Sequence, residues 1–398
     1  MILSRKRSFP SRLIRHRING LKRYFQNPNF SLTECMIIGI DASRAFQKNK
    51  TGIEEYSYQV IKNLRSYLCG DRVILYLNPA INTKPDFNLP NNWKIKYLYA
   101  PIFWTQARLS LEMLFCPVDI LFVPAHTVPL IHPKNTFVAI HGLEYEFYPE
   151  AYSFWQRFYM RFVIKNSCRW AKKIIAVSEN TKKDLIKLYG VQEKKIRVIY
   201  EGINDNVKSR ISRIKYLKSF RDNKYLLFIG RLEKRKNICG IIEAFQILKK
   251  KYNLPHKLVL AGKFGYGEKD IKNEIKNSKY KEDIILPGYI SNEEKFELMK
   301  KAEIFLFPTF YEGFGLPILE AQSAGVPVAT SNISSMPEVA GNGAILVNPK
   351  DANAIAEAAH KIISDESYKN DIIKKGLENV KRFSWGKCAK RLADIIQS

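Results

Sequence analysis

IFLFPTFYEGFGLPILEAQSAGVPVAT, residues 304–330, is the stretch that decides the fold of this chain. The run Ile304–Phe307 contains no polar residue, which is typical of a strand buried on both faces. The apolar content of Leu316–Ala324 predicts a helix that packs on the sheet, with Pro317 in its first turn and Gly325 directly after its end. The stretch therefore indicates strand, loop, helix and strand, the repeating unit of a parallel α/β sheet.

The loop between this strand and this helix is a candidate ligand site. The backbone N–H groups of Phe314, Gly315 and Leu316 lie at the predicted helix start, where unpaired donors and the helix dipole favour an anion such as a diphosphate. Glu312 and Glu320 would accept hydrogen bonds from two separate hydroxyl groups of a long polar ligand. The alternative for either glutamate alone is an ordinary surface acid in a salt bridge.

A second loop, GRLEKRKN at residues 230–237, follows the first predicted strand of the second half of the chain. In open α/β sheets ligands bind beyond the carboxyl ends of the strands, so this loop lies where chemistry is expected. Arg231 with its planar fork and Lys236 with its point charge would clamp a diphosphate. We interpret Lys234 and Arg235 as members of a solvated basic turn.

The alternation of strand and helix runs twice along the chain, which predicts an α/β protein with two Rossmann-like, doubly wound domains that face an interdomain cleft. We place the first domain at residues 36–205, a polar linker at 206–223, the second domain at 224–383 and a last helix at 384–398, for which a return to the first domain is one option. The predicted strands are Met36–Ile40, Val73–Leu77, Ile120–Val123, Phe137–Ile140, Ile174–Val177, Ile196–Ile199, Tyr225–Ile229, Lys257–Leu260, Ile284–Leu286, Ile304–Phe307, Val326–Ala329 and Ile345–Val347. The predicted helices include Ile53–Leu68, Ser153–Ala171, Asn180–Leu188, Ile238–Lys250, Glu293–Lys300, Ala352–Ile363, Ser367–Lys381 and Gly386–Ile396.

The composition indicates an anionic partner and a reducing compartment. Lys and Arg number 65 against 38 Asp and Glu, a formal net charge of +27, which suits phosphates, nucleic acid or an anionic membrane surface. The six cysteines are scattered without a Cys-x-x-Cys pair, so neither a zinc site nor a disulfide framework is indicated. No apolar run approaches the about 18 residues of a membrane-spanning helix. We expect a cytoplasmic protein.

Residues 1–35 form a basic N-terminal extension. Apolar residues at Ile14, Ile18, Leu21 and Phe25 recur at helical spacing and would give a short helix with one oily and one cationic face. Such a helix suits peripheral attachment at the inner face of the plasma membrane. The alternative is a disordered, solvated tail.

Several motifs, taken together and in order, resemble the family 4 retaining glycosyltransferases of the GT-B fold, which is sometimes called group 1. The resemblance runs from about residue 36 to the C-terminus. In the second half it is carried by GRL at 230–232 with KN at 236–237, Gly262, PGYI at 287–290 and EGFGLPILE at 312–320. In the first half it is carried by GIDASR at 39–44, TGIEEY at 51–56, VAIHGL at 138–143 and AVSENT at 176–181.

The resemblance implies a role for each matched residue of a nucleotide-sugar donor site. Arg231 and Lys236 would bind the diphosphate and stabilise charge on the leaving group. Glu312 would contact hydroxyls of the transferred sugar, and Glu320 would hold the nucleotide ribose. Main-chain atoms would complete the site, at Gly230, at Phe314, Gly315 and Leu316 for phosphate and sugar, and at Tyr289 and Ile290 for the base edge.

The first half would supply the acceptor side. Gly52 would let its loop approach donor phosphate or acceptor, and His141 would face the transferred sugar, with a structural histidine at a strand end as the alternative. Many relatives carry Asp after this His, whereas Gly142 follows here, so Glu144 and Glu146 are candidates to replace that carboxylate. Aromatic and basic side chains that would line an acceptor cleft, touch lipid or simply pack in the core are Phe103, Trp104, Arg108, Tyr145, Phe147 and Tyr148.

The expected activity is transfer of a sugar, with mannose on a GDP carrier as the first candidate, to a saccharide or lipid-linked saccharide in cell-surface polysaccharide biosynthesis. The matched motifs contain no carboxylate nucleophile, so the resemblance implies attack beside the departing diphosphate. The Asp-x-Asp motif of metal-dependent transferases is absent, and we expect no metal and no cofactor besides the donor substrate. Two alternatives stay open: a GT-B glycosyl phosphorylase or sugar-nucleotide epimerase, and a non-catalytic basic protein that binds membranes or nucleic acid.

Overall fold

A computed structural model describes residues 36–48, 50, 52–203 and 224–398 of the chain. The predicted N-terminal extension with its amphipathic helix, and the predicted linker 206–223, lie outside the described residues. Within the described ranges no helix is long and apolar enough to cross a membrane.

The first half of the chain forms a sheet of seven parallel strands in the order β3-β2-β1-β4-β5-β6-β7. Strand β1 lies between β2 and β4, and its Ile38 pairs with Val73 on one side and Ile120 on the other. The strand order therefore reverses beside β1. The strands are β1 (Ile37–Asp41), β2 (Arg72–Leu77), β3 (Trp93–Tyr97), β4 (Ile120–Val123), β5 (Asn135–Ile140), β6 (Lys173–Ala176) and β7 (Ile196–Val198), and the helices are α2 (Gly52–Leu64), α3 (Ser110–Phe115), α4 (Glu144–Phe147), α5 (Phe154–Trp170) and α6 (Glu179–Tyr189).

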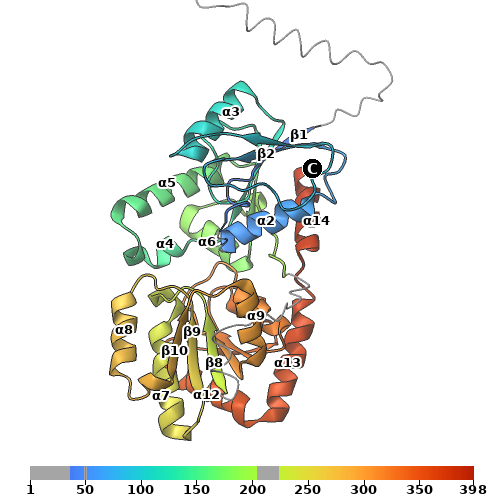
Figure 1. Ribbon diagram of the computed structural model, residues 1–398. Coiled ribbons are helices and arrows are strands. Elements are labelled where there is room, and N and C mark those ends of the chain that lie inside the picture. The colour runs from blue at the N-terminus through green and yellow to red at the C-terminus, as the bar shows by residue number, and fades with distance from the viewer. Residues whose placement is uncertain (1–35, 49, 51, 204–223) are drawn as a thin grey trace, which may run out of the picture. The chain divides into compact units, whose positions relative to one another are not determined.

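The second half forms a sheet of six parallel strands in the order β10-β9-β8-β11-β12-β13, with helices on both sides (Figure 1). Here β8 lies between β9 and β11, so the order reverses between β8 and β11. The strands are β8 (Tyr225–Ile229), β9 (Lys257–Ala261), β10 (Ile284–Gly288), β11 (Ile304–Phe307), β12 (Val328–Ser331) and β13 (Ala344–Val347). The helices are α7 (Ile238–Tyr252), α8 (Glu268–Asn277), α9 (Asn292–Lys301), α10 (Leu316–Ser323), α11 (Met336–Ala340), α12 (Ala352–Ser364), α13 (Glu366–Val380) and α14 (Trp385–Ile396).

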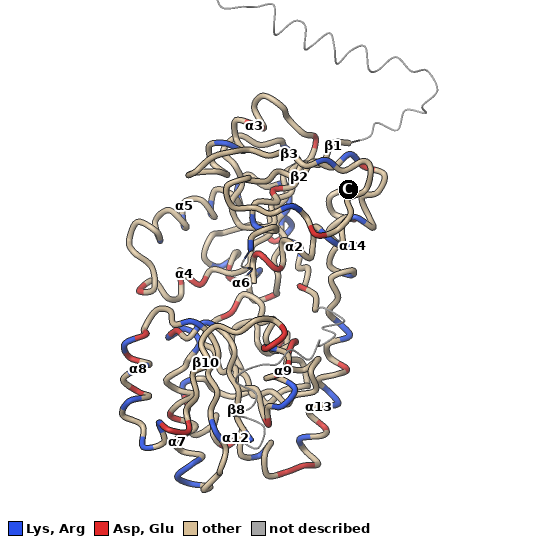
Figure 2. Tube along the Cα trace, viewed as in Figure 1, with Lys and Arg blue, Asp and Glu red and all other residues tan. Residues whose placement is uncertain are grey.

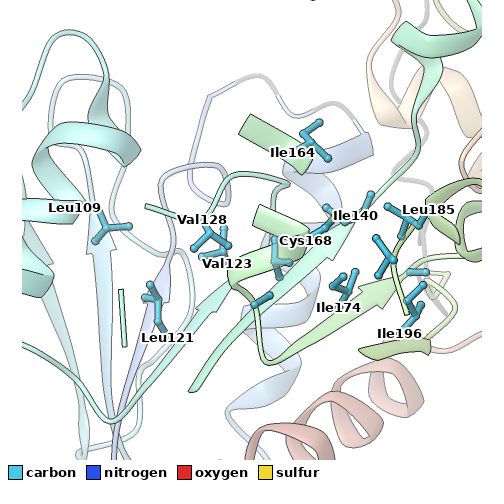
Figure 3. Close-up of a cluster of buried hydrophobic side chains, with 14 of the residues drawn as sticks. Leu109, Leu121, Val123, Val128, Ile140, Ile164, Cys168, Ile174, Leu185 and Ile196 are labelled. Carbon is cyan, nitrogen blue, oxygen red and sulfur yellow. The ribbon is translucent and has the colours of Figure 1, made fainter. Parts of the chain in front are cut away.

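Apolar strands buried on both faces account for this architecture. Every residue of β4 and of β11 is buried, as expected when helices cover both sides of a parallel sheet. Figure 3 shows the core of the first half, where Val123 and Ile140 from the strands meet Ile164 and Cys168 from α5. The predicted fold class, two doubly wound α/β domains, is confirmed.

The elements that the sequence prediction missed include strand β3 and helix α8, and strand β12 starts later than predicted. Strand β3 reads WKIKY and lies at the sheet edge, where alternating lysines mask the apolar pattern. Helix α8 is mostly charged and buries only Ile271, so its periodicity is weak. Strand β12 begins at Val328 rather than Val326, because the N–H of Val326 donates to the carbonyl of Ala321 at the end of α10 instead of joining the sheet.

The last helix, α14, lies beside α2 of the first half (Figure 1). The rings of Tyr56 on α2 and Trp385 on α14 lie 6.0 Å apart, and Gln397 donates a 2.8 Å hydrogen bond to Asp71. Just before α14, Ser384 pairs with Ile203 in a parallel bridge. Packing of this kind joins the C-terminus to the first half of the chain.

Candidate functional site

The site centres on one carboxylate and two cations at the point where the strand order of the second sheet reverses. Glu312 follows β11, and Arg235 and Lys236 follow the neighbouring strand β8. The Glu312 carboxylate forms ion pairs with Arg235, whose Nη1 lies 3.1 Å away, and with Lys236 Nζ. All three side chains are largely buried, with 14%, 18% and 11% of their areas exposed. Burial makes the pairing strong, because little water screens it.

The charges of this cluster depend on one another. Burial raises the pKa of the Glu312 carboxyl, but attraction from Arg235 and Lys236 outweighs burial and holds that pKa below its usual value. Burial lowers the pKa of Lys236, and attraction from Glu312 only partly offsets this effect. Glu312 is therefore ionised at neutral pH, and its negative charge helps to keep Lys236 protonated in this buried position.

Arg235 belongs to the site and is not part of a solvated turn, which corrects the sequence interpretation. Its guanidinium donates to the carbonyl of Tyr311 at 2.6 Å and to Glu233 at 2.8 Å, besides its ion pair with Glu312. The neighbour Lys234 does face solvent, where it pairs with Asp270 on α8. Spacing along the loop could not separate these two cations, because the choice depends on the short helical turn at Lys234–Lys236.

Asn237 fixes the loop that carries both cations. Its backbone is left-handed with φ of 59°, and its buried side-chain amide donates to the carbonyls of Pro308 at 3.1 Å and Pro349 at 2.6 Å. The resemblance contained Asn237, but sequence reasoning gave it no role. This side chain joins the loop after β8 to the loop after β11, and so it positions Lys236 next to Glu312.

Replacing Asn237 by alanine is expected to destabilise the protein by about 1–3 kcal/mol, because two buried carbonyls lose their donor and alanine tolerates the left-handed backbone poorly. Asn277, at the end of the surface helix α8, is the matched control, and its alanine variant should unfold like the native protein. Denaturant unfolding measures both effects. Equal stability of the two variants would contradict the positioning role.

Serine hydroxyls hold the loop that contains Glu312. Ser334 accepts from the N–H of Glu312 at 3.2 Å, and Ser334 and Ser335 both donate to its carbonyl, at 2.8 and 2.9 Å. The loop then enters α10 through Gly315, whose φ of 119° suits glycine. Sequence reasoning missed both serines, because a hydroxyl that supports a distant loop has no local signature.

Gly313 lies directly against the backbone of His141 in the first half. A Cβ added at Gly313 would fall 1.4 Å from the His141 carbonyl oxygen, so no side chain fits. The carbonyl of Gly313 accepts from Ser178 Oγ at 2.6 Å and from Thr181 Oγ1 at 3.1 Å. These contacts bring two sequence motifs together, VAIHGL and AVSENT, around the loop of Glu312.

His141 is held by two acceptors within the protein. Its Nε2 donates to the carbonyl of Pro124 at 2.8 Å, since a carbonyl only accepts, and its Nδ1 lies 3.2 Å from the buried carboxylate of Glu201. The Tyr56 ring meets the imidazole edge-on with centroids 4.4 Å apart. The role that the resemblance implies for His141, contact with the transferred sugar, stays a prediction.

The structure explains why a glycine, Gly142, follows His141. Gly142 has φ of 151°, and a Cβ there would lie 3.1 Å from Gly313 Cα and 3.3 Å from Glu144 Oε2. The carboxylate of Glu144 thus lies beside the position of an added side chain at residue 142. Glu146 points elsewhere and binds Arg161 at 2.6 Å and the Tyr189 hydroxyl at 2.8 Å. Of the two candidate replacements, only Glu144 is near Gly142 and Gly313.

Tyr311, next to Glu312, also contacts the first half. Its hydroxyl donates to Asp184 at 2.8 Å and accepts from the N–H of Leu143 at 3.1 Å, while its ring stacks on Phe147 with centroids 4.4 Å apart. Burial raises the pKa of the Asp184 carboxyl, and the hydrogen bond from Tyr311 lowers it in part. Phe147 is one of the aromatic residues singled out from the sequence.

The remaining predicted residues lie outside the charged cluster. The side chain of Arg231 is 68% exposed, with its Nε 3.8 Å from Glu233, whereas Gly230 and Gly262 pack so closely that a Cβ on Gly262 would strike the Gly230 carbonyl. Glu320 on α10 pairs with Lys295 on α9 at 2.5 Å. Tyr289 is exposed and Ile290 half-buried, while an added Cβ at Gly52 would meet no atom within 4 Å. Of the four residues predicted to be catalytic, Glu312 and Lys236 are paired directly, and His141 reaches them only through Gly313.

The described part of the chain offers no metal-binding group of three or more His, Cys, Asp or Glu side chains. In the charged cluster, Arg235 and Lys236 neutralise Glu312. A diphosphate entering this loop would meet cations and backbone N–H groups, which suits an anion.

Comparison with known proteins gives the class that this fold and site define. The family model "Glycosyl transferases group 1" matches residues 210–379, and the model "Glycosyltransferase Family 4" matches residues 51–207. The chain belongs to the group 1, family 4 glycosyltransferases and has the GT-B fold.

The individual relatives are similar over part or most of their length. The chain is 32% identical over 234 residues to the O-antigen chain mannosyltransferase B of Escherichia coli, which covers 58% of this chain and 61% of that relative. It is 27% identical over 328 residues to the O-antigen chain mannosyltransferase RfbU of Salmonella typhimurium, which covers 79% of this chain and 88% of the relative. Anabaena HepE, solved in complex with UDP and glucose, superposes with a TM-score of 0.68 at 18% identity, covering 92% of this chain and all of HepE, and so supports the fold alone.

Proposed function

We propose that this protein is a retaining glycosyltransferase that moves a hexose from a nucleotide-diphosphate sugar to a saccharide or lipid-linked saccharide in cell-surface polysaccharide biosynthesis. Mannose is the first candidate for the sugar, because two of the similar proteins bear the name O-antigen chain mannosyltransferase. The observation that carries the proposal is the buried cluster of Glu312, Arg235 and Lys236 at the switch point of the second sheet.

The proposed reaction uses these residues for positioning and charge stabilisation. Lys236 and Arg231 hold the diphosphate, and the Glu312 carboxylate accepts a hydrogen bond from a hydroxyl group of the sugar. The acceptor hydroxyl attacks the anomeric carbon beside the departing diphosphate, the bond from that carbon to the diphosphate oxygen breaks, and the diphosphate oxygen takes the hydroxyl proton. Charge on the leaving group grows as the bond breaks, so preformed cations stabilise the transition state more than the ground state.

The pairing of Glu312 with both cations has a consequence for donor binding. Lys236 forms an ion pair with Glu312, so a diphosphate would compete with that carboxylate for the lysine. Arg235 remains to pair with Glu312 when Lys236 turns to the diphosphate. We propose Arg235 as the residue that keeps Glu312 ionised and oriented toward the sugar during transfer.

A panel of nucleotide sugars tests the function, since a ligand that binds the native state raises its thermal stability. The panel includes GDP carriers, because GDP-mannose is the first candidate donor, and UDP carriers, because HepE was solved with UDP. Donors that stabilise the protein are then incubated with saccharide acceptors. Nucleotide release that requires an acceptor supports transfer. Nucleotide release that requires inorganic phosphate would favour a phosphorylase, and an isomerised donor would favour an epimerase. Salt-sensitive binding of nucleic acid, without affinity for any donor, would favour a non-catalytic protein.

We expect kcat/KM for the donor to fall at alkaline pH, and to do so at a lower pH than the usual lysine pKa of 10.5 would give. Burial lowers the pKa of Lys236 below this usual value. As the pH rises through the lowered pKa, Lys236 loses its proton and the diphosphate loses a cation. The ratio kcat/KM for the donor reports the free enzyme, so its pH profile measures this loss.

Lys236→Arg is the matched variant for the pH profile, because arginine stays charged throughout this range. Its alkaline decline is expected to shift upward or to disappear, whatever its activity at neutral pH. An identical alkaline decline in both proteins would assign the titration to another group.

A further inference from the structure

Helix α5 buries one face and leaves a large aromatic face in water. The helix begins with a capping box, in which Ser153 and Gln156 bind each other's backbone N–H groups, so its start is well fixed. Toward the sheet it buries Val163, Ile164, Ser167 and Cys168. The opposite face has no partner among the described residues that buries it. Its side chains are Phe154, Trp155, Phe158, Tyr159 and Phe162, exposed by 74%, 74%, 57%, 46% and 60%.

Helical spacing gathers these five aromatic rings on one face. Phe154, Phe158 and Phe162 follow one another every four residues, and Trp155 and Tyr159 form the adjacent row. Phe154 packs edge-on against Trp155 with centroids 5.4 Å apart, and Trp155 lies 6.5 Å from Phe158. A contiguous aromatic surface of this size is rare on soluble proteins unless it contacts something.

All charged residues of helix α5 are cationic. Its charged residues are Arg157, Arg161, Lys165 and Arg169, and its sequence contains no Asp or Glu. Figure 2 shows α5 in blue and tan, with red on the neighbouring α4. Arg161 is paired with Glu146 of α4 and Arg157 is half-buried, whereas Lys165 and Arg169 are exposed and form no ion pair within the described part of the chain. The partner of this face must therefore accept both aromatic rings and positive charge.

We propose that α5 docks on an anionic lipid bilayer, with its aromatic rings in the interfacial region and its cations on lipid phosphates. Tryptophan and tyrosine favour the membrane interface, where one end of the ring is apolar and the other wet. Lys and Arg beside such a face add attraction to anionic lipids. A protein partner would need a matching acidic and apolar groove, whereas a bilayer supplies both features over its whole surface.

The docking face is joined to the site through α4. Glu146 on α4 binds Arg161 of α5, and the next residue, Phe147, stacks on Tyr311, the neighbour of Glu312. Docking of α5 would thus hold the acceptor side of the site near the bilayer, where a lipid-linked saccharide would be presented. This last step rests on the proposed function, but binding to the bilayer does not.

Flotation with vesicles tests the docking face in the full-length protein. The native chain is mixed with vesicles of phosphatidylcholine, with and without phosphatidylglycerol. We expect it to float with the anionic vesicles. The variant Trp155→Ser/Phe162→Ser should bind them about tenfold less tightly or worse, since two exposed rings no longer enter the interface. The matched control is Leu346→Ser/Leu377→Ser, two exposed leucines of the second half, which should float like the native protein.

A second measurement places the helix itself at the bilayer. Anionic vesicles should shift the tryptophan emission of the native protein to shorter wavelength, and Trp155→Phe should lose this shift while still floating. Equal flotation of the native protein and the α5 double variant would overturn the proposal. The proposal would also be overturned if vesicle binding were lost only when residues 1–35 are deleted and not when the α5 aromatic residues are replaced. If the native protein formed dimers without vesicles and the double variant were monomeric, the aromatic face of α5 would instead be the contact with a second copy of the chain. These assays use no donor sugar, so vesicle binding without sugar transfer refutes only the proposed function.

Discussion

Lys236→Ala is expected to lower kcat/KM for sugar transfer by about a hundredfold or more, the usual cost of removing a preorganised group that stabilises transition-state charge. Lys236 is the buried cation next to Glu312, and no other lysine contacts that carboxylate among the described residues. Its loss leaves Glu312 with Arg235 alone and leaves the diphosphate without its point charge. Acceptor-dependent nucleotide release measures the effect.

The Lys236 variant needs a stability control, because breaking a buried ion pair typically costs about 3–5 kcal/mol. Lys236→Met keeps most of the side-chain volume and should show the same kinetic loss with a smaller structural cost. Lys234→Ala, two residues earlier in the same loop, removes an exposed lysine and should stay within about twofold of native activity. Near-native transfer by a folded Lys236→Ala or Lys236→Met protein would refute the assignment of the donor site.

Gly313→Ala is expected to reduce transfer by about a hundredfold, since a displacement of about 1 Å in a catalytic group can have that effect. The new Cβ would overlap the His141 carbonyl oxygen and would lie 2.6 Å from the carbonyl carbon. Both neighbours are backbone, so no side-chain rotation relieves the overlap. The loop of Glu312 must move away from His141, and the hydrogen bonds from Ser178 and Thr181 to Gly313 are lost or lengthened.

A lower melting temperature should accompany the loss of activity in Gly313→Ala, because the contact between the two loops also contributes to stability. Gly70→Ala is the matched control, since an added Cβ there meets nothing within 4 Å. Native activity in Gly313→Ala would mean that the close contact between Gly313 and His141 is not part of the working enzyme.

Much of the fold was predictable because its strands are apolar runs. Three of the predicted strands, Ile120–Val123, Tyr225–Ile229 and Ile304–Phe307, have the observed bounds. Each is buried on both faces, so no polar residue blurs its limits. The edge strand β3 was missed for the opposite reason, since its lysines alternate with apolar residues.

The sequence predicted several residues of the site but not the contacts between them. Glu312 and Lys236 were identified from motifs, and the structure pairs them. Arg235 was assigned to solvent, because a run of basic residues does not reveal which side chain turns inward. The contact of Gly313 with His141 joins residues far apart in the sequence, and only the tertiary structure brings them together.

Calorimetric titration with nucleotide-diphosphate sugars tests most directly whether the Glu312, Arg235 and Lys236 cluster is the donor site. The native protein is expected to bind at least one donor of the panel, and Lys236→Met to bind the same donor about tenfold or more weakly while it remains folded. Equal affinity of the native protein and Lys236→Met for that donor would contradict the account.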